Sequence, residues 1–260
     1  MVAAPYGLLE ETIGDAFVAY GNDPEVEFSD TDDCRWVVTG VGYEGFNAVL
    51  RAPCASAGDI EEALEPFRRR RAPMLWHLFD ADAVRSGERL IENGFEFYEE
   101  EPGMVAHLDA VVAPSTMPPG LRISPVRSED ELRQFGEILT GSRNAAFLER
   151  VTRLRAATGL GIDATFQHLI GRLDGRPVAS AAVAHGRNAS EIQHVVTLPD
   201  ARRRGIGTAM TAAAMTAASH HGHDQAVLTS SPEGAGVYRS LGFDVVCTVR
   251  RFLWKPPESQ

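Results

Sequence analysis

Apolar and polar positions along residues 121–260 follow the periods of strands and helices. Strict alternation predicts a strand, and apolar residues three or four apart predict the buried face of a helix. Asp174-Gly175 separates two apolar segments and is a strong hairpin signal, and the Ser-x-x-Glu sequence at Ser128 is a capping box that begins a helix. In chain order the pattern predicts a strand at 121–126, helices at 128–139 and 143–157, strands at 166–173, 177–185 and 191–198, a helix at 208–219, a strand at 226–230, a helix at 233–241 and a final strand pair within 243–254.

The loop between the strand at 191–198 and the helix at 208–219 carries the most specific chemistry. Its sequence from Arg202 to Gly207 is Arg-Arg-Arg-Gly-Ile-Gly. Gly205 and Gly207 have no Cβ, so a ligand can approach the backbone closely. The first amides of the following helix have no intrahelical partner and attract an anion. The loop therefore predicts a phosphate site, and the expected ligand is a pyrophosphate.

Two other kinds of glycine loop fit this segment poorly. A Walker loop requires a lysine after its last glycine, and the only lysine of the chain is Lys255, near the C-terminus. A dinucleotide-binding loop requires a third glycine where Met210 stands, and no acidic residue follows about twenty positions later at the end of a second strand. A nucleoside triphosphatase and a dinucleotide-binding protein are therefore disfavoured.

Two motifs in fixed order connect the chain with a known family. Arg202, Gly205 and Gly207 fill the pattern Gln/Arg-x-x-Gly-x-Gly/Ala, and Tyr238 is followed four and five residues later by Gly242-Phe243. In these motifs the chain resembles the GCN5-related N-acetyltransferase (GNAT) superfamily. The resemblance implies an α/β (α+β) fold with a mixed, mostly antiparallel sheet flanked by helices. It also implies an acetyl-CoA-dependent N-acetyltransferase, with acetyl-CoA (coenzyme A) as cosubstrate and a primary amine of a small molecule or peptide as acceptor.

Length and charge divide the chain into two tandem domains. A chain of 260 residues is long for one acetyltransferase domain, and the Pro-rich segment 114–120 has the composition of a linker. Residues 1–120 carry 23 acidic and 8 basic residues, whereas the rest of the chain carries 13 and 17. We therefore expect an N-terminal domain at 1–113 and a catalytic domain at 121–260. The acidic half either attracts a cationic amine or only aids solubility.

The N-terminal domain repeats part of the catalytic order in a degenerate form. The segment 51–58 contains no Arg-x-x-Gly-x-Gly sequence, and Leu90 stands four residues before Gly94, where the C-terminal motif has its tyrosine. We therefore expect a GNAT-like domain that does not catalyse and that forms a wall of the substrate cleft. An unrelated α+β domain is the alternative. The pattern predicts strands at 46–50, 73–79 and 104–108 and helices at 60–70 and 81–93.

The resemblance assigns residues to the cosubstrate. In this superfamily the strand before the loop splays from its neighbour and offers backbone groups to the pantetheine arm. That strand segment is here Val195, Val196 and Thr197. The pyrophosphate site is here Arg202, Arg203, Arg204, Gly205, Ile206, Gly207 and Thr208. Ser231 stands where many relatives carry an Asn that contacts the cofactor, although Ser231-Pro232 also has the sequence of a helix N-terminus.

Acyl transfer to an amine requires a group that takes the ammonium proton, and a proton donor can assist the leaving thiolate. By the resemblance, Tyr238 lies near the thioester sulfur and is the candidate acid. Glu191 stands eleven residues before the loop, where histone acetyltransferases of the superfamily carry their glutamate, and is the candidate base. By strand alternation Glu191 shares a face with Gln193, Val195 and Thr197. His194, on the opposite face, is a weaker candidate base, and many relatives use only ordered water.

The composition restricts which binding partners and which cellular location we expect. A net charge of −11 argues against nucleic acid, because duplex binding depends on basic residues that neutralise phosphates. No apolar stretch is long enough to span a membrane, and residues 1–11 lack a basic region and a long apolar core. We therefore expect a cytoplasmic protein without a membrane partner, present as a monomer or homodimer.

Cysteines and histidines do not predict a metal site. The three cysteines are widely spaced and odd in number, which predicts reduced thiols. His220, His221 and His223 surround Gly222 after the loop helix, which indicates a helix C-terminus rather than a ligand cluster. No metal is therefore expected. Two functional alternatives stay open: a non-catalytic acyl-CoA-binding regulatory module, and an enzyme that transfers the acyl group to a thiol or hydroxyl.

Overall fold

The computed structural model describes residues 5–54, 56–79, 83–110, 117–142 and 144–257. The elements of the N-terminal half are α1 (Pro5–Val18), η1 (Ala19–Asn22), β1 (Glu27–Asp30), β2 (Arg35–Val38), η2 (Glu44–Phe46), β3 (Ala48–Arg51), α2 (Ala57–Arg70), β4 (Met74–Leu78), α3 (Ala83–Glu92), β5 (Glu96–His107) and η3 (Leu108–Ala110). Those of the C-terminal half are β6 (Leu121–Pro125), α4 (Glu129–Thr140), α5 (Ala145–Ala156), β7 (Phe166–Leu173), β8 (Arg176–His185), β9 (Ser190–Thr197), η4 (Pro199–Ala201), α6 (Ile206–His220), β10 (Gln225–Thr229), α7 (Ala235–Ser240) and β11 (Asp244–Trp254).

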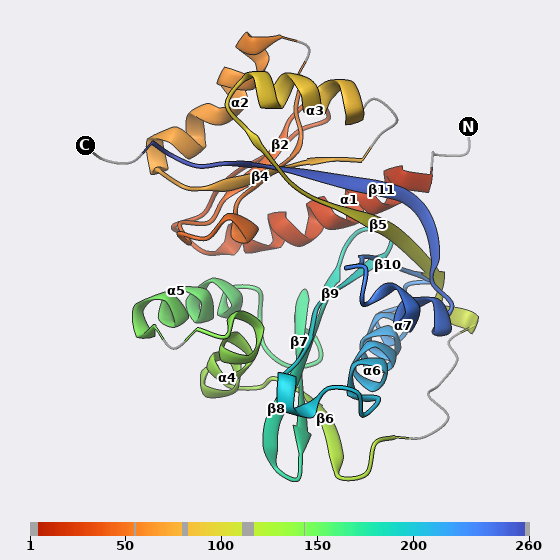
Figure 1. The fold of residues 1–260 in the computed structure, drawn as a ribbon. Helices are drawn as coiled ribbons and strands as arrows, with labels where there is room; N and C mark the ends of the chain where they lie inside the picture. Colours follow the sequence, from red (N-terminus) through yellow and green to blue (C-terminus); the bar gives the residue numbers. More distant parts are fainter. Residues whose placement is uncertain (1–4, 55, 80–82, 111–116, 143, 258–260) are drawn as a thin grey trace.

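One mixed sheet of 11 strands runs through both halves of the described chain (Figure 1). Its strand order is β1-β2-β3-β4-β11-β5-β10-β9-β8-β7-β6. Neighbouring strands are antiparallel except in the β3–β4 and β9–β10 pairs, which are parallel. The predicted mixed, mostly antiparallel sheet is therefore confirmed.

The two halves exchange their last strands. β5 ends the N-terminal half and pairs with β10, where Val105 lies opposite Val227. β11 ends the chain and pairs with β4, where Phe252 lies opposite Trp76. β5 and β11 also pair with each other, and Figure 1 shows them side by side from the upper to the lower part of the molecule. Side chains of β5 therefore reach cavities of the C-terminal half.

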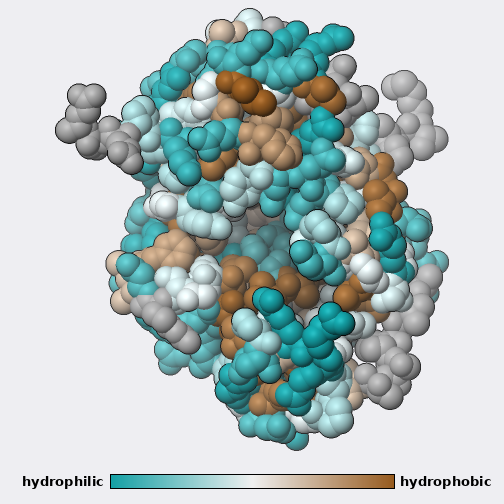
Figure 2. All heavy atoms as spheres, in the orientation of Figure 1, coloured by the Kyte–Doolittle hydropathy of each residue, from teal (hydrophilic) through white to brown (hydrophobic). Residues whose placement is uncertain are grey.

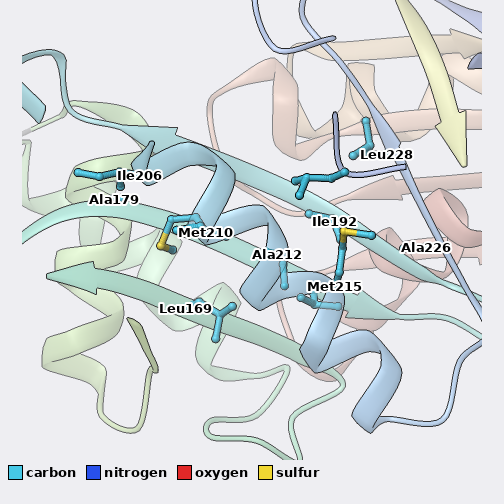
Figure 3. Close-up of a cluster of buried hydrophobic side chains, with 14 of the residues drawn as sticks. Leu169, Ala179, Ile192, Ile206, Met210, Ala212, Met215, Ala226 and Leu228 are labelled. Carbon is cyan, nitrogen blue, oxygen red and sulfur yellow. The ribbon is translucent and has the colours of Figure 1, made fainter. Parts of the chain in front are cut away.

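Helices cover both faces of the sheet. α1, α4 and α5 lie over one face, where Ala16 and Phe17 of α1 contact the cluster around Phe135. In the C-terminal half α6 covers the opposite face, and α2 and α3 do so in the N-terminal half. Figure 3 shows Met210 and Met215 of α6 among buried side chains of the strands. The burial of these apolar side chains stabilises the sheet. It also fixes the positions of the strand ends, beside which the cavities lie.

The segment β3–α2–β4 repeats the arrangement of β9–α6–β10, because each is a strand, a helix and a parallel strand. The two helices begin differently. The amide of Asp59 donates to Ser56 Oγ at 3.2 Å, and the amide of Ser56 donates to Asp59 Oδ2 at 2.8 Å, a capping box that places an acidic side chain at the start of α2. α6 instead begins at Gly205, which has a φ of 74° and no side-chain cap. Of the two helix starts, only that of α6 is left free for an anion.

Several predictions about elements can be compared with the structure. The Asp174-Gly175 hairpin is confirmed, with φ of 50° and 86° at its two residues. The predicted strand pair within 243–254 is wrong, because β11 is one strand that pairs with β4 on one side and β5 on the other. α1, β1 and β2 were not predicted. Residues 114–116 of the expected linker lie outside the described residues, and the division into domains stays a prediction. No described helix is both long and apolar enough to cross a membrane.

Candidate active site

Strands β9 and β10 diverge toward the C-terminal end of β9. They pair only at Ser190 and Glu191 of β9, whereas the other edge of β9 pairs with β8 as far as Thr197. Beyond Glu191, the edge of β9 that faces β10 has no strand partner among the described residues. Backbone groups at 195–197 therefore have no strand partner on this side, at the place predicted for the pantetheine arm, although the carbonyl of Thr197 accepts from Arg202 Nε.

A β-bulge interrupts β9 at His194. The register with β8 shifts between Gln193 and Val196, and His194 has a φ of 56°. Because a bulge inserts one residue, the side chains beyond it change faces. His194 consequently lines the same cavity as Glu191, and its predicted place on the opposite face is wrong. Val195 packs toward α6, so the prediction that it shares a face with Glu191 is also wrong.

A cavity of about 720 Å³ lies between the end of β9, the start of α6 and the segment before α7; we call it the coenzyme cavity. Every residue predicted to bind the cosubstrate lines it except Arg204, which is exposed. The lining residues are Val195, Val196, Thr197, Ala201, Arg202, Arg203, Gly205, Ile206, Gly207, Thr208, Ser231, Glu233, Gly234 and Val237.

The start of α6 has the properties of an anion site. Among the described residues, the amides at 203–208 make no hydrogen bond, and the first helical bond is donated by Ala209 to the carbonyl of Gly205. A Cβ added at Gly207 would meet no atom of the described chain closer than Thr197 Oγ1 at 3.9 Å, so the glycine leaves open space on the cavity side. The free amides, the helix dipole and this space fit a pyrophosphate.

The polar side chains of the coenzyme cavity have defined positions. Arg202 Nε donates to the carbonyl of Thr197 at 3.0 Å and ties the loop to β9. Arg203 has a φ of 61°, an uncommon conformation for a residue with a side chain. Ser231 Oγ accepts from the amide of Gly234 at 3.3 Å, so it stabilises the turn before α7 while its residue lines the cavity.

A second cavity, of about 310 Å³, lies on the α1 face of the sheet and contains both predicted catalytic residues. Glu191 and Tyr238 line it from β9 and α7. Residues 191–194 line this cavity and residues 195–197 line the coenzyme cavity, so β9 runs from one into the other. The remaining walls come from α1, the 43–45 segment, β4, β5, β10 and β11.

Glu191 is a buried carboxyl, not the exposed strand residue that its polarity would allow. Its relative exposure is 7%, and Gln193 Nε2 donates to its Oε2 at 3.0 Å. Burial raises the pKa of Glu191 to about 8, and the charge of Arg251 opposes this shift. A carboxyl with this pKa can take up and release a proton near neutral pH.

Tyr238 lies at the junction of the two cavities. Its neighbour Val237 lines the coenzyme cavity, and Tyr238 itself lines the cavity of Glu191. Burial raises the pKa of the Tyr238 hydroxyl, and the charge of Glu101 adds to the increase. The hydroxyl therefore stays protonated at neutral pH and is available as a proton donor.

The sequence did not single out the charged wall of the second cavity. Arg251 Nη1 donates to Glu99 at 2.7 Å and to Glu101 at 2.8 Å, and its Nη2 donates to Thr229 Oγ1 at 2.8 Å. The glutamates lie on β5 and Arg251 on β11, the two exchanged strands. The only indication in the sequence was the three consecutive glutamates at 99–101, a pattern that is equally typical of a solvent-exposed strand.

A buried arginine, Arg155, lies beside the imidazole of His194. Arg155 has a relative exposure of 0%, and its guanidinium lies over three aromatic rings. Its Nη1 is 3.0 Å from His168 Nε2, and its Nη2 is 3.5 Å from His194 Nε2. Because arginine only donates, both Nε2 atoms accept. Burial, with the charge of Arg155, lowers the pKa of both histidines well below the usual value. The accepting nitrogen of His194 is thus occupied, which disfavours it as a base.

The histidines after α6 lie at a helix C-terminus, as predicted. α6 ends at His220, and Gly222 has a φ of 97°. His221 stacks on His185 with ring centroids 3.8 Å apart, and Ser190 Oγ lies between His185 and His223. Within the described residues, no group of His, Cys, Asp and Glu side chains has an arrangement that could hold a metal ion.

Comparisons with known proteins point to one family. Residues 164–245 match the model of the acetyltransferase (GNAT) domain. No curated protein matches the chain. A GCN5-related N-acetyltransferase from Kribbella flavida has a similar structure, with a TM-score of 0.73 and 19% identity over 99% of this chain and 98% of its own. A GCN5-related N-acetyltransferase from Sphaerobacter thermophilus has a TM-score of 0.61 and 16% identity over 99% and 94%.

A tandem GNAT protein from the clavulanic acid biosynthesis pathway is also similar, with a TM-score of 0.62 and 11% identity over 99% of this chain and 94% of its own. At these identities the similarity concerns the fold. It extends over both halves of the chain, whereas the family model covers only residues 164–245.

Proposed function

We propose, from the premise that the chain belongs to the GNAT superfamily of acetyltransferases, that it transfers an acetyl group from acetyl-CoA to a primary amine of a small molecule or peptide. The observation that carries the proposal is the pair of cavities joined along β9. The coenzyme cavity contains the N-terminus of α6, with unpaired amides, and the part of β9 that has no strand partner on one edge. The second cavity contains the buried carboxyl of Glu191 and the side chain of Tyr238.

The coenzyme cavity accounts for the cosubstrate. The amides at 203–208 would hold the pyrophosphate, with Arg202 and Arg203 adding positive charge. The open backbone at 195–197 would hold the pantetheine arm. Acetyl-CoA, when bound, supplies the acetyl group as an activated thioester.

Glu191 and Tyr238 account for the proton transfers. An ammonium acceptor must lose a proton before its nitrogen can form the new bond to the acetyl carbon. Glu191 takes that proton, and its pKa of about 8 suits this exchange near neutral pH. As the bond from the acetyl carbon to sulfur breaks, the Tyr238 hydroxyl supplies a proton to the sulfur. The nitrogen, now bonded to the acetyl carbon, loses its second proton, which restores the Tyr238 hydroxyl, while Glu191 releases the first proton to water.

The experiment is a calorimetric titration of coenzyme A and acetyl-CoA into the protein and two variants. Gly205→Glu places a side chain and a negative charge at the start of α6, and we expect affinity to fall at least about hundredfold. Gly222→Glu is the matched control. Gly222 also has a positive φ and no atom within 4 Å of an added Cβ, but it lies at the other end of α6. Equal affinity in both variants would refute the coenzyme site.

The regulatory alternative makes a different prediction. A module that only binds acyl-CoA would bind acetyl-CoA and show no transfer to any amine, whereas an enzyme would transfer the acetyl group and, in Glu191→Gln, lose rate but keep its affinity for the coenzyme. A screen of amines with detection of released thiol separates the two functions.

A further inference from the structure

Three hollows adjoin one another on the α1 face of the sheet, and together they mark one path along it. The cavity of Glu191, a small hollow of about 20 Å³ and a hollow of about 610 Å³ all share Gly45 and His194 as lining residues. We call this path the acceptor channel. It runs from Glu191 to the gap between η2 and the α4–α5 connection. Figure 2 shows the molecule hollowed between its upper and lower parts, with hydrophobic side chains beside the hollow.

The inner end of the acceptor channel is acidic. The carboxylates of Glu99 and Glu101 line it together with Glu191, whose pKa of about 8 keeps most of it neutral at pH 7. Arg251 is the only arginine or lysine lining the channel among the described residues. Arg251 already donates to Glu99, Glu101 and Thr229. The inner end therefore attracts an ammonium group and offers no free cation to a carboxylate.

Among the described residues, the middle of the acceptor channel carries no positive charge that could receive a carboxylate. His194 lines all three hollows, and its Nε2 faces Arg155. Arg155 is fully buried and does not line the channel. His77, at the inner end, also has a pKa well below the usual value because it is buried beside Arg251. Both imidazoles are neutral at the pH of the reaction.

The described residues at the outer end of the acceptor channel are largely apolar and aromatic; Arg143 of the α4–α5 connection lies outside the described residues. Tyr43, Phe46, Leu139 and Phe147 line the hollow of about 610 Å³, together with short polar residues of the α4–α5 connection. Tyr43 is 46% exposed, so an aromatic surface is available without rearrangement of the core. Such walls bind a ring or a hydrocarbon through dispersion and the release of water.

We propose that the acceptor is a primary amine carried on an aromatic or apolar body, with no carboxylate on the carbon next to the nitrogen. The inference rests on the proposed function and selects among amines. The ammonium lies at the carboxylates of the inner end, and the body lies between η2 and α5. An amino acid of the same body is rejected, because its carboxylate would lie beside Glu99 and Glu101, which already share the one guanidinium of Arg251.

The experiment compares three acceptors with the full chain and acetyl-CoA: phenethylamine, phenylalanine and ethylamine. Phenylalanine differs from phenethylamine only by a carboxylate, and ethylamine only lacks the ring. Released thiol and the mass of the N-acetylated product are measured. We expect kcat/KM for phenethylamine to exceed that for phenylalanine at least about hundredfold and that for ethylamine at least about tenfold. Equal or better use of either control overturns the inference.

The same experiment separates the inference from the proposed function. If coenzyme A binds and phenethylamine is not acetylated, the acceptor class is wrong while the coenzyme site stands. If coenzyme A does not bind, the proposed function fails. In either case the acceptor proposal is rejected.

Two matched pairs of variants place the effect in the acceptor channel. Gly45→Val adds a side chain where the channel hollows meet, next to Tyr43 Cε1 at 3.1 Å, whereas Gly42→Val adds one in open space outside the channel. Gly45→Val should lower kcat/KM for phenethylamine about tenfold and leave ethylamine within about twofold, and Gly42→Val should change neither.

The second pair tests the carboxylates. Glu101→Gln should reduce the preference for phenethylamine over phenylalanine about tenfold. Glu100→Gln should not, because Glu100 pairs with Arg250 and does not line the channel. An unchanged preference in Glu101→Gln, with coenzyme A affinity retained, would show that the carboxylates do not select the acceptor.

Discussion

Replacing Glu191 by glutamine should make the protein more stable at high pH while it slows acetyl transfer. The carboxyl is 7% exposed, and its pKa is raised from 4.5 to about 8 by burial. Below pH 4.5 the group is protonated in both the folded and the unfolded chain. Between pH 4.5 and about 8 the unfolded chain releases this proton and the folded chain keeps it. Stability therefore falls as pH rises through this window.

The size of the effect follows from the pKa difference. One pKa unit corresponds to about 1.4 kcal/mol. The shift of Glu191 therefore costs the folded state about 2 kcal/mol at pH 6 and at most about 5 kcal/mol above pH 8. Glutamine does not titrate, so the free energy of unfolding of Glu191→Gln relative to the wild type should rise by these amounts between pH 4.5 and 9.

The assay is urea unfolding of both proteins at pH 5, 6, 7, 8 and 9, and it requires no acceptor. Glu100→Gln is the control, because the Glu100 side chain is 45% exposed and no comparable pH-dependent gain is expected. A stability difference that is independent of pH, or a Glu191→Gln variant that loses stability as pH rises, would refute the reasoning. With an acceptor, the same variant should lower kcat about 10²–10⁴-fold.

Two further predictions concern the acid and the contact between the halves. Tyr238→Phe should lower kcat about tenfold or more and leave coenzyme A affinity within about twofold, because it removes a proton donor and keeps the ring. A thiol-release assay measures kcat and calorimetry measures the affinity. An unchanged kcat would show that Tyr238 is not the proton donor. Asp23→Ala should lower the free energy of unfolding by about 3 kcal/mol, because Arg150 of α5 would lose its buried carboxylate and keep, among the described residues, only the ion pair with Glu25, which is 47% exposed. Asp200→Ala, which breaks an exposed pair with Arg176, should unfold at the same urea concentration as the wild type, and equal midpoints for both variants would contradict the prediction.

The sequence alone predicted the features that depend on short-range signals. Glycines at 205 and 207 between a strand and a helix predicted the phosphate site that we propose for this cavity, because the absence of a Cβ and the free amides are local properties. Asp174-Gly175 predicted its hairpin because both residues tolerate a positive φ. The family resemblance added Tyr238 and Glu191, which the structure places in one cavity.

Other features depend on pairings between distant parts of the chain, and only the tertiary structure decided them. The exchange of β5 and β11 carries Glu99, Glu101 and Arg251 to the site, and no pattern within either strand specifies its partner. The bulge at His194 inserts one residue, so a count of alternating positions assigns the wrong faces beyond it. Burial, which raises the pKa of Glu191, exists only once α1 and the exchanged strands cover β9. Local chemistry therefore predicted where the proposed cosubstrate site lies, and long-range packing determined what surrounds the proposed catalytic carboxyl of Glu191.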